Sequence, residues 1–370
     1  MLKERFSSFF SAKYLHKVNA IRAILCIFVF CMKKSLIITA AVIVMGSILS
    51  GGCKKDNSTT KGTLDGNLKL VMPAYVESGY TKTFSLDTMT VLSRPDGAKI
   101  GYYFANPFKE KNDTVITADG KIDKKSYTFE VEDTLGVVSL VFGAVSSDDY
   151  YGKSTTTSFT VVKKGLDGRG SITGFRSYDE DILFTDTRDG RTYKAVKAGD
   201  LLWMRSNLAW NGSGLPYLRY DVLSDIFGRY YTWEEAQTAC PDGWRLPTEA
   251  DWSALAESCG KEVGADGSIN GMAGKVMADI YFNDTRMWEF SRYVKLTDET
   301  HLSALPAGYV SLAGDDASFS SMYKYAAFWT SDQNDDKGIL RYIYRDSDTV
   351  YAGQYDKSSF AASVRCVRSE

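Results

Sequence analysis

One apolar run decides which part of this 370-residue chain can build a globular fold. Met32-Lys33-Lys34 precedes the run, which covers residues 35–49, and Ser50-Gly51-Gly52 separates it from Cys53. Its fifteen residues are short for a membrane-spanning helix, which needs about 20. A basic segment, an apolar core and small residues, in this order, indicate a secretory signal that is removed. We therefore expect residues 1–52 to be a leader and the folded protein to follow it.

The cysteine after the small residues makes this segment resemble a bacterial lipoprotein signal. The resemblance implies that the Cys53 thiol is lipidated and that its acyl chains hold the protein on the outer membrane, facing the cell surface or the periplasm. An uncleaved membrane anchor is the alternative. Residues 1–31 precede a signal that is complete without them, so Met32 is the expected true start. Residues 53–65 are expected to form a flexible linker.

The composition limits the class of protein and of partner. A hydrophobic fraction of 44% and a charged fraction of 24% are typical of a folded globular protein. The net charge of −2 provides no basic surface field, which excludes nucleic acid as the main partner. Without the leader the chain keeps 37 basic and 45 acidic residues, so the processed protein is acidic.

Residues 66–164 carry apolar side chains with a period of two, as strands with one solvent-facing side do. About seven short strands separated by turns predict an all-β immunoglobulin-like sandwich. The candidate strands are 68–72, 83–86, 99–104, 114–118, 127–131, 137–145 and 155–162. The pattern resembles immunoglobulin-like and PKD-like domains of bacterial surface proteins, which implies a spacer without chemistry of its own.

Four Asp-Thr-apolar triplets resemble the O-glycosylation acceptors of Bacteroidota-like bacteria. They place candidate acceptors at Thr88, Thr114, Thr134 and Thr349. A three-residue pattern also arises by chance, so unmodified threonines are the alternative.

Two short helices are expected in residues 170–370, which contain all seven Trp. Thr232-Trp233-Glu234-Glu235 has the form of a capping box, and a Pro-Asp-Gly break ends that helix after Cys240. Thr248 is the expected N-cap of the second helix, and Gly260 is its stop signal. Large aromatic side chains concentrated in one segment indicate a compact core or a binding face.

A series of ordered motifs covers residues 185–369. They are Asp189-Gly190-Arg191-Thr192-Tyr193, Trp203-Met204, Asn207-Leu208, Gly228-Arg229-Tyr230-Tyr231-Thr232-Trp233, Cys240-Pro241-Asp242-Gly243-Trp244-Arg245-Leu246-Pro247, Leu305-Pro306-Ala307-Gly308, Phe328-Trp329-Thr330-Ser331 and Val364-Arg365-Cys366-Val367-Arg368. Together they resemble the Fibrobacter succinogenes major paralogous domain family. That family looks related to C-type-lectin-like folds, which implies an α+β domain over 170–370 with a twisted antiparallel sheet, two helices and long loops.

Three cysteines remain beside the lipidated one: Cys240, Cys259 and Cys366. From the sequence alone, all three pairings of these thiols are open. The resemblance implies a disulfide between Cys240 and Cys366, since C-type-lectin-like domains join the first helix to the last strand. Cys259 lies on the apolar stripe of the second helix, where a buried free thiol is ordinary packing.

The residues argue against an enzyme and against a resident cofactor. His301 is the one histidine after the leader, which excludes multi-histidine metal sites; we expect a surface or structurally bonded side chain. The sulfatase-modifying enzymes, which the motifs also resemble, use paired late cysteines, whereas this chain has Cys366 alone. Asp332, Asp335 and Asp336 offer oxygen ligands for a structural Ca²⁺, and a solvated acidic turn is the alternative.

Tyrosine-rich loops and strands supply the candidate ligand contacts, Tyr309, Tyr323, Tyr325 and Trp329. Further tyrosines follow at 342, 344, 351 and 355, in an alternation that also fits the face of a strand. We expect a cell-surface lipoprotein with a non-catalytic binding or adhesion domain for a glycan or a surface protein. The alternatives are a structural subunit of a surface or fimbrial assembly and, less favoured, a sulfatase-modifying-like enzyme.

Overall fold

The computed structural model describes residues 61–89, 92, 100–114, 126–146, 150–163 and 170–370. The predicted signal, Cys53 and most of the expected linker lie outside these residues. The end of the predicted flexible linker is wrong, because Gly62 and Thr63 pair with Tyr150 and Tyr151 and Leu64 is buried in the first apolar core, so the folded region begins before residue 66. Within the described ranges, no helix combines the length and the apolar character that a bilayer span requires. The described chain is rich in strands and contains only short helices, which confirms the β-rich character predicted from the sequence.

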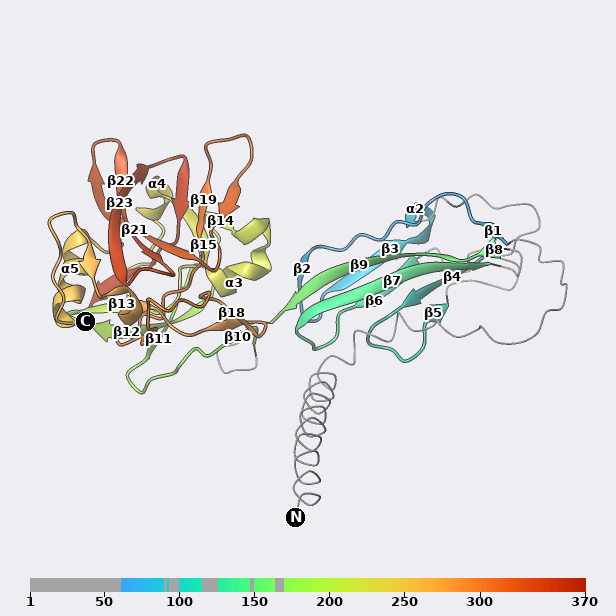
Figure 1. Ribbon diagram of the computed structural model, residues 1–370, viewed down its shortest axis with the longest axis horizontal. Helices are drawn as coiled ribbons and strands as arrows, with labels where there is room; N and C mark the ends of the chain where they lie inside the picture. The colour runs from blue at the N-terminus through green and yellow to red at the C-terminus, as the bar shows by residue number, and fades with distance from the viewer. Residues whose placement is uncertain (1–60, 90–91, 93–99, 115–125, 147–149, 164–169) are drawn as a thin grey trace, which may run out of the picture. The chain divides into compact units, whose positions relative to one another are not determined.

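The first β-rich region contains a five-stranded and a two-stranded sheet (Figure 1). The larger sheet has the order β2-β9-β7-β4-β5, with β2 parallel to β9 and the other pairs antiparallel. The smaller sheet pairs β3 with β6, and β1 forms a short parallel pair with β8. The bounds are Gly62–Thr63 (β1), Tyr75–Glu77 (β2), Thr81–Ser85 (β3), Leu86–Met89 (α2), Ile100–Ala105 (β4), Asp113–Thr114 (β5), Ser126–Glu130 (β6), Gly136–Ser146 (β7), Tyr150–Tyr151 (β8) and Lys153–Val162 (β9).

An apolar core lies between the five-stranded sheet and the β3-β6 pair. Phe84 of β3 stacks on Phe104 of β4 with ring centroids 5.9 Å apart, and Phe129 of β6 meets Phe159 of β9 at 6.0 Å. Phe129 is buried whereas both of its neighbours in the sequence are exposed. The period of two in the sequence thus places one face of each strand in the core.

Most predicted strands of this region are confirmed within a few residues: 83–86, 99–104, 127–131, 137–145 and 155–162. The predicted strand 68–72 is wrong, because only Leu68 forms a bridge there and pairing with β9 begins after Pro73. Proline has no N–H to donate to a ladder. The predicted strand 114–118 begins within β5, and its remainder lies outside the described residues.

Residues 170–370 form four sheets and several short helices (yellow-green to red in Figure 1). The sheet orders are β10-β17-β18, β11-β12-β13-β25, β14-β15-β24-β19-β20 and β16-β23-β22-β21. The strand bounds are Ile172–Thr173 (β10), Ile182–Thr185 (β11), Thr192–Ala198 (β12), Leu201–Met204 (β13), Leu215–Pro216 (β14), Arg229–Thr232 (β15), Ile269–Asn270 (β16), Tyr281–Phe282 (β17), Thr285–Arg286 (β18), Tyr309–Ser311 (β19), Ser318–Ser320 (β20), Tyr325–Asn334 (β21), Lys337–Tyr344 (β22), Thr349–Asp356 (β23), Phe360–Ala362 (β24) and Val367–Ser369 (β25). The helix bounds are Tyr217–Arg219 (η1), Asp221–Leu223 (η2), Ser224–Phe227 (α3), Trp233–Ala236 (α4), Glu249–Ser258 (α5) and Ala273–Val276 (α6).

Both predicted helices are present, and a capping box begins each. At α4, Thr232 Oγ1 accepts the Glu235 N–H at 3.2 Å, and Glu235 Oε2 accepts the Thr232 N–H at 2.8 Å. Thr248 and Asp251 make the equivalent pair of bonds at α5, at 3.1 and 2.6 Å. These bonds satisfy amides that the first turn of a helix leaves without partners.

The two helices differ in how they end. At α5, Cys259 is the C-cap and Gly260 adopts a φ of +67°, which confirms the predicted stop. At α4, the helix ends at Ala236, four residues before the predicted end at Cys240. The chain continues there in tight turns, in which the Ala239 N–H bonds the Ala236 carbonyl at 3.3 Å.

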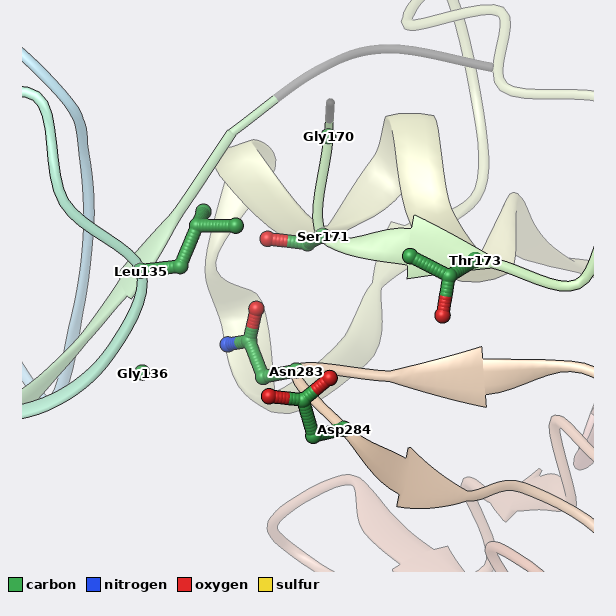
Figure 2. A pocket seen from close by; sticks show the side chains of 7 residues that line it. All are labelled: Leu135, Gly136, Gly170, Ser171, Thr173, Asn283 and Asp284. Carbon is green, nitrogen blue, oxygen red and sulfur yellow. The ribbon is translucent and has the colours of Figure 1, made fainter. Parts of the chain in front are cut away.

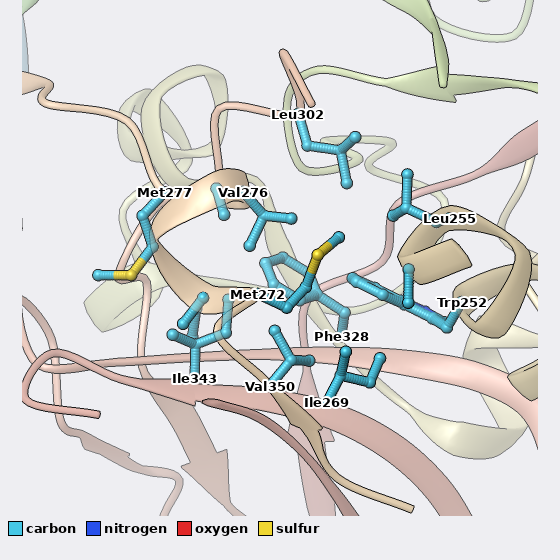
Figure 3. Packing of buried hydrophobic residues seen from close by; sticks show 14 of the residues in the cluster. Trp252, Leu255, Ile269, Met272, Val276, Met277, Leu302, Phe328, Ile343 and Val350 are labelled. Atoms are coloured by element: carbon cyan, nitrogen blue, oxygen red, sulfur yellow. The ribbon is translucent and has the colours of Figure 1, made fainter. Parts of the chain in front are cut away.

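A large apolar cluster of this region lies between α5 and the sheet β16-β23-β22-β21. Figure 3 shows Trp252 and Leu255 of α5, Met272 beside them, and Phe328 and Ile343 from β21 and β22. Each of these five side chains is at most 1% exposed. The apolar stripe predicted for the second helix therefore belongs to the core, as do most of the large aromatic side chains.

The closing segment, residues 360–369, runs between three of the four sheets. Its β24 pairs with β15 and β19, and its β25 pairs with β13. Between these strands, the Ser363 N–H bonds the Ala327 carbonyl of β21 at 3.1 Å. The Cys366 carbonyl accepts the Met204 N–H at 3.0 Å. The segment therefore fixes the positions of sheets that are formed by distant parts of the sequence.

The disulfide implied by the resemblance is present. It joins Cys240 to Cys366, which are 126 residues apart in the sequence. Cys259 is a free thiol, and it is half-buried rather than fully buried. The link connects the turns after α4 to the closing segment, so it adds a covalent bond where the hydrogen bonds already converge.

We predict that replacing Cys240 and Cys366 together by Ala lowers the free energy of unfolding by about 4–5 kcal/mol. The reason is that the disulfide closes a long loop in the unfolded chain and so lowers the conformational entropy of the unfolded state. Urea unfolding of the oxidised protein, followed by Trp fluorescence, measures this change. Cys259→Ala is the control, with an expected change below about 1 kcal/mol. Equal losses in the two variants would show that thiol packing, and not the link, is responsible.

Candidate functional site

Five half-buried or exposed tyrosines lie together, four on β22 and β23 and one on β19. We call them the tyrosine face: Tyr309, Tyr342, Tyr344, Tyr351 and Tyr355. Tyr342 of β22 is the cross-strand partner of Tyr351 of β23. Side chains two or four residues apart on a strand point to the same side, so Tyr344 and Tyr355 join this pair. The sheet register thus gathers four tyrosines that the sequence shows only as an alternation.

The rings of the tyrosine face pack against one another. Tyr342 and Tyr351 stack with centroids 5.2 Å apart and an interplanar angle of 16°. Tyr344 meets Tyr342 edge to face at 5.6 Å and 82°, and it remains 45% exposed. Stacked and edge-to-face contacts are favourable and fix ring orientations. The face therefore presents aromatic surface whose geometry is set before any ligand arrives.

A glycine and a phenylalanine complete the tyrosine face. A Cβ on Gly353 would lie 2.9 Å from Tyr342 Cε1 and 2.8 Å from Tyr355 Cε2, so a larger residue would displace both rings. Phe360 of the closing segment packs against Tyr355 at 4.3 Å and against Tyr309 at 5.1 Å. Sequence reasoning missed both residues, because their roles depend on pairing between distant strands.

The Tyr342 and Tyr344 hydroxyl groups are neutral at physiological pH. Burial, followed by the neighbouring Tyr355, raises the pKa of Tyr342 and of Tyr344 above the usual value of a phenol. The Tyr351 hydroxyl lies 2.8 Å from Ser347 Oγ. A neutral phenol both donates and accepts hydrogen bonds. The face thus combines apolar ring surface with uncharged polar groups.

Two of the four predicted ligand contacts lie in the core. Tyr325 is 3% exposed, and Trp329 is 0% exposed with its Nε1 donating to the Tyr231 carbonyl at 2.7 Å. Both belong to β21, which the closing segment covers, so they support the tyrosine face without offering surface to a ligand. Tyr309 belongs to the face itself. Tyr323 is half-buried against a different apolar cluster.

The three aspartates expected to offer calcium ligands lie in different settings, and calcium binding stays a prediction. Asp332 Oδ2 accepts the Glu249 N–H at the start of α5, at 2.7 Å. Asp335 occupies the β21–β22 turn at a φ of +52°, and Asp336 is exposed, 3.8 Å from Lys337 Nζ. In the described part of the chain, no group of three or more His, Cys, Asp or Glu side chains is arranged to hold a metal ion.

Comparison with known proteins identifies the region that carries the tyrosine face. The family model of the Fibrobacter succinogenes major domain matches residues 196–368, from β12 to β25. Residues 196–368 belong to that family. No curated protein and no solved structure matches the chain. The matched residues include the whole tyrosine face and both cysteines of the disulfide.

His301 of the Fibrobacter succinogenes major domain has a structural environment. Its ring stacks on Tyr178 with centroids 3.5 Å apart, and its Nδ1 lies 3.0 Å from Glu180 Oε1. Its backbone adopts a φ of +57°, and its carbonyl accepts a hydrogen bond from Arg205 Nε at 2.7 Å. The ring and the carbonyl are therefore both engaged, as the expectation of a structurally bonded histidine requires.

The candidate glycosylation acceptors lie in different settings. Thr88 is exposed, and its Oγ1 donates to the Ser85 carbonyl at 2.9 Å. Thr349 donates to Asn270 Oδ1 at 2.9 Å. Thr134 is half-buried, and Thr114 belongs to β5. Glycosylation at these positions stays a prediction.

A small hollow of about 70 Å³ is shown in Figure 2. It is lined by Leu135, Gly136, Gly170, Ser171, Thr173, Asn283 and Asp284. Ligand pockets usually enclose about 300–1,000 Å³. The hollow is therefore too small to be the candidate functional site.

A buried ion pair fixes the turn between β11 and β12. Asp186 Oδ2 accepts Arg188 Nη2 at 2.7 Å, and Oδ1 accepts the Arg188 Nε at 2.9 Å. The Asp186 side chain is fully buried. The guanidinium also lies 4.1 Å from the Trp210 ring centroid and donates to the Ala239 carbonyl at 2.8 Å. Although burial opposes it, the Arg188 contacts hold the pKa of Asp186 below its usual value.

We predict that Asp186→Asn lowers the free energy of unfolding at pH 7 by about 1–3 kcal/mol, because Arg188 loses its ionised partner. A depressed carboxyl pKa contributes stability above the unfolded value of about 4, and this is lost as the pH falls through the folded value. The difference between wild type and variant should therefore shrink in acid. Urea unfolding between pH 7 and pH 3 tests this, with the exposed Asp336→Asn as control. A difference that does not change with pH would contradict the assignment.

Proposed function

We propose that this protein is an outer-membrane lipoprotein whose C-terminal domain binds a neutral glycan on the tyrosine face without catalysis. The anchor would be the lipidated Cys53. The first β-rich region, from β1 to β9, would act as an immunoglobulin-like spacer, and residues 170–370 would be a lectin-like domain. The packing of two sheets around Phe84, Phe104 and Phe129 supports the first assignment. Short helices mixed with strands, long loops and a disulfide that joins the turns after α4 to the closing segment support the second.

The tyrosine face is the observation that carries the proposal. Its rings offer flat apolar surface, which suits the C–H faces of sugars, and its hydroxyls suit sugar hydroxyls. Because ring contacts already fix the side chains, little conformational entropy is lost on binding. Phenols with a pKa of about 10 or above are uncharged at neutral pH, and the pKa values of Tyr342 and Tyr344 are raised, so these side chains offer no charge to an ionic ligand.

A non-catalytic role fits what the residues offer. The one histidine of residues 53–370, His301, is held by stacking and by Glu180. Cys366, the cysteine that a sulfatase-modifying chemistry would need, is engaged in the disulfide. Because neither His301 nor Cys366 is available as a ligand, we also propose that the protein holds no cofactor.

We predict that the double variant Tyr344→Ala, Tyr351→Ala weakens glycan binding by about tenfold or more, since aromatic anchors carry much of a binding energy. The full-length protein is screened against an array of neutral and charged glycans, and the affinity for the best ligand is then measured. Tyr293→Ala removes a tyrosine that is 64% exposed outside the face and serves as the control. Unchanged binding in the double variant, or capture of only protein partners by the wild type, would refute the glycan assignment.

We predict that Cys53→Ser abolishes incorporation of labelled palmitate and moves the protein from the membrane to the soluble fraction, because the acyl chains provide the anchor. Fractionation and metabolic labelling in cells measure both effects. Cys259→Ser is the matched control and should behave as wild type. A Cys53→Ser protein that stays in the membrane would instead support an uncleaved anchor.

A further inference from the structure

A polar pocket separate from the tyrosine face opens in residues 172–228. Its volume is about 590 Å³, within the range of about 300–1,000 Å³ that small-molecule sites usually show. The pocket is lined by Ile172, Asp189, Gly190, Arg191, Thr192, Tyr193, Ser206, Asn207, Ala209, Asn211, Ser224, Asp225, Ile226 and Gly228. These residues come from β10, the β11–β12 turn with the start of β12, the loop after β13, and α3 with the glycine that follows it.

Arg191 is held between two carboxylates in this pocket. Its Nη1 donates to Asp189 Oδ2 at 2.6 Å, and its Nε donates to Asp225 Oδ1 at 2.9 Å. The Arg191 side chain remains 22% exposed. A guanidinium has five N–H donors, and these two bonds use two of them. Asp189 Oδ1 also accepts the Arg191 backbone N–H at 3.1 Å, so both Asp189 oxygens bond Arg191 and a ligand hydroxyl would share them through their second lone pairs. The pocket therefore presents a fixed donor group beside fixed carboxylates.

The remaining wall is rigid and partly apolar. Ile172 and Ile226 are buried, at 5% and 6% exposure. The Tyr193 hydroxyl accepts the Ala209 N–H at 3.1 Å. Gly228 has a φ of +76°, and a Cβ there would lie 2.4 Å from the Asn207 Cβ. Glycine is therefore required for this wall to close against the loop after β13.

The pairing of these groups selects the chemistry of the ligand. An anion would approach Arg191 only between two carboxylates, which repel it. A cation would be repelled by the Arg191 guanidinium, which lies between the two carboxylates. A hydroxyl can donate to Asp189 or Asp225 while it accepts from Arg191, so it matches alternating acceptors and donors. The apolar wall suits a C–H face of the same molecule.

We propose that this pocket binds one neutral sugar residue, held through its hydroxyls by Arg191 and the two carboxylates. The inference goes beyond the tyrosine face, because it concerns different residues and a single sugar unit rather than an extended surface. The pocket and the face are two separate binding sites on one domain.

The test is saturation-transfer NMR on the purified full-length protein, with glucose, galactose, mannose and N-acetylglucosamine as neutral probes. Free lysine serves as a cationic probe, and sulfate is added as an anionic competitor. At least one sugar should show transfer that sulfate does not displace. Asn211→Trp fills the pocket from an exposed position and should weaken that binding by about tenfold or more. Asn334→Trp places the same ring at an exposed position of the β21–β22 hairpin, and the sugar affinity of this control should stay within about twofold of wild type.

Arg191→Gln provides a second variant, with a thermal unfolding curve to show that it remains folded. Loss of sugar transfer in folded Arg191→Gln supports the proposal. Transfer from lysine alone, displacement by sulfate, or no transfer from any sugar would overturn it. Sugar transfer that persists in Asn211→Trp but is lost in Tyr344→Ala would also overturn it, because the single sugar would then bind the tyrosine face. Conversely, failure of glycan-array binding with intact sugar transfer would refute only the function proposed for that face.

Discussion

A buried guanidinium in the closing segment holds the major domain together. Arg365 is 1% exposed. It donates to Asn207 Oδ1 at 2.9 Å and to the carbonyls of Met204, Leu302 and Ser303. Burial lowers its pKa to about 9, so it remains charged at neutral pH. A buried charge is tolerated only when such bonds replace its lost water. The side chain thus connects two distant segments, residues 204–207 and 302–303, to the closing segment, where an apolar residue would leave their carbonyls without this donor.

Both proposed binding surfaces depend on the closing segment. Phe360 supports the tyrosine face from β24, through its contacts with Tyr355 and Tyr309. Asn207, which lines the polar pocket, is fixed on one side by Arg365 and on the other by the Phe227 carbonyl. The surfaces are therefore presented by a rigid scaffold rather than by loops that order on binding, a property that favours recognition at low entropic cost.

The sequence predicted what depends on local patterns. The capping boxes at Thr232 and Thr248 and the stop at Gly260 follow from short-range rules, and the structure confirms them. The disulfide was available only through the family resemblance, since the three cysteines alone allow three pairings. The candidate site was harder to predict. Trp329 and Tyr325 read as surface aromatics, yet both are buried, because burial depends on which distant strand covers them.

The connection of β13, residues 201–204, to residues 367–369 carries a consequence for how the protein matures. A ribosome must add more than 150 residues before this pairing can form, and such non-local contacts form slowly because of the loop-closure entropy. Disulfides usually form in oxidising compartments, so the export that we propose would also favour formation of the Cys240–Cys366 link. In a chain exported as we propose, this topology would delay folding of the domain until after translocation, so the chain would reach the secretion machinery unfolded.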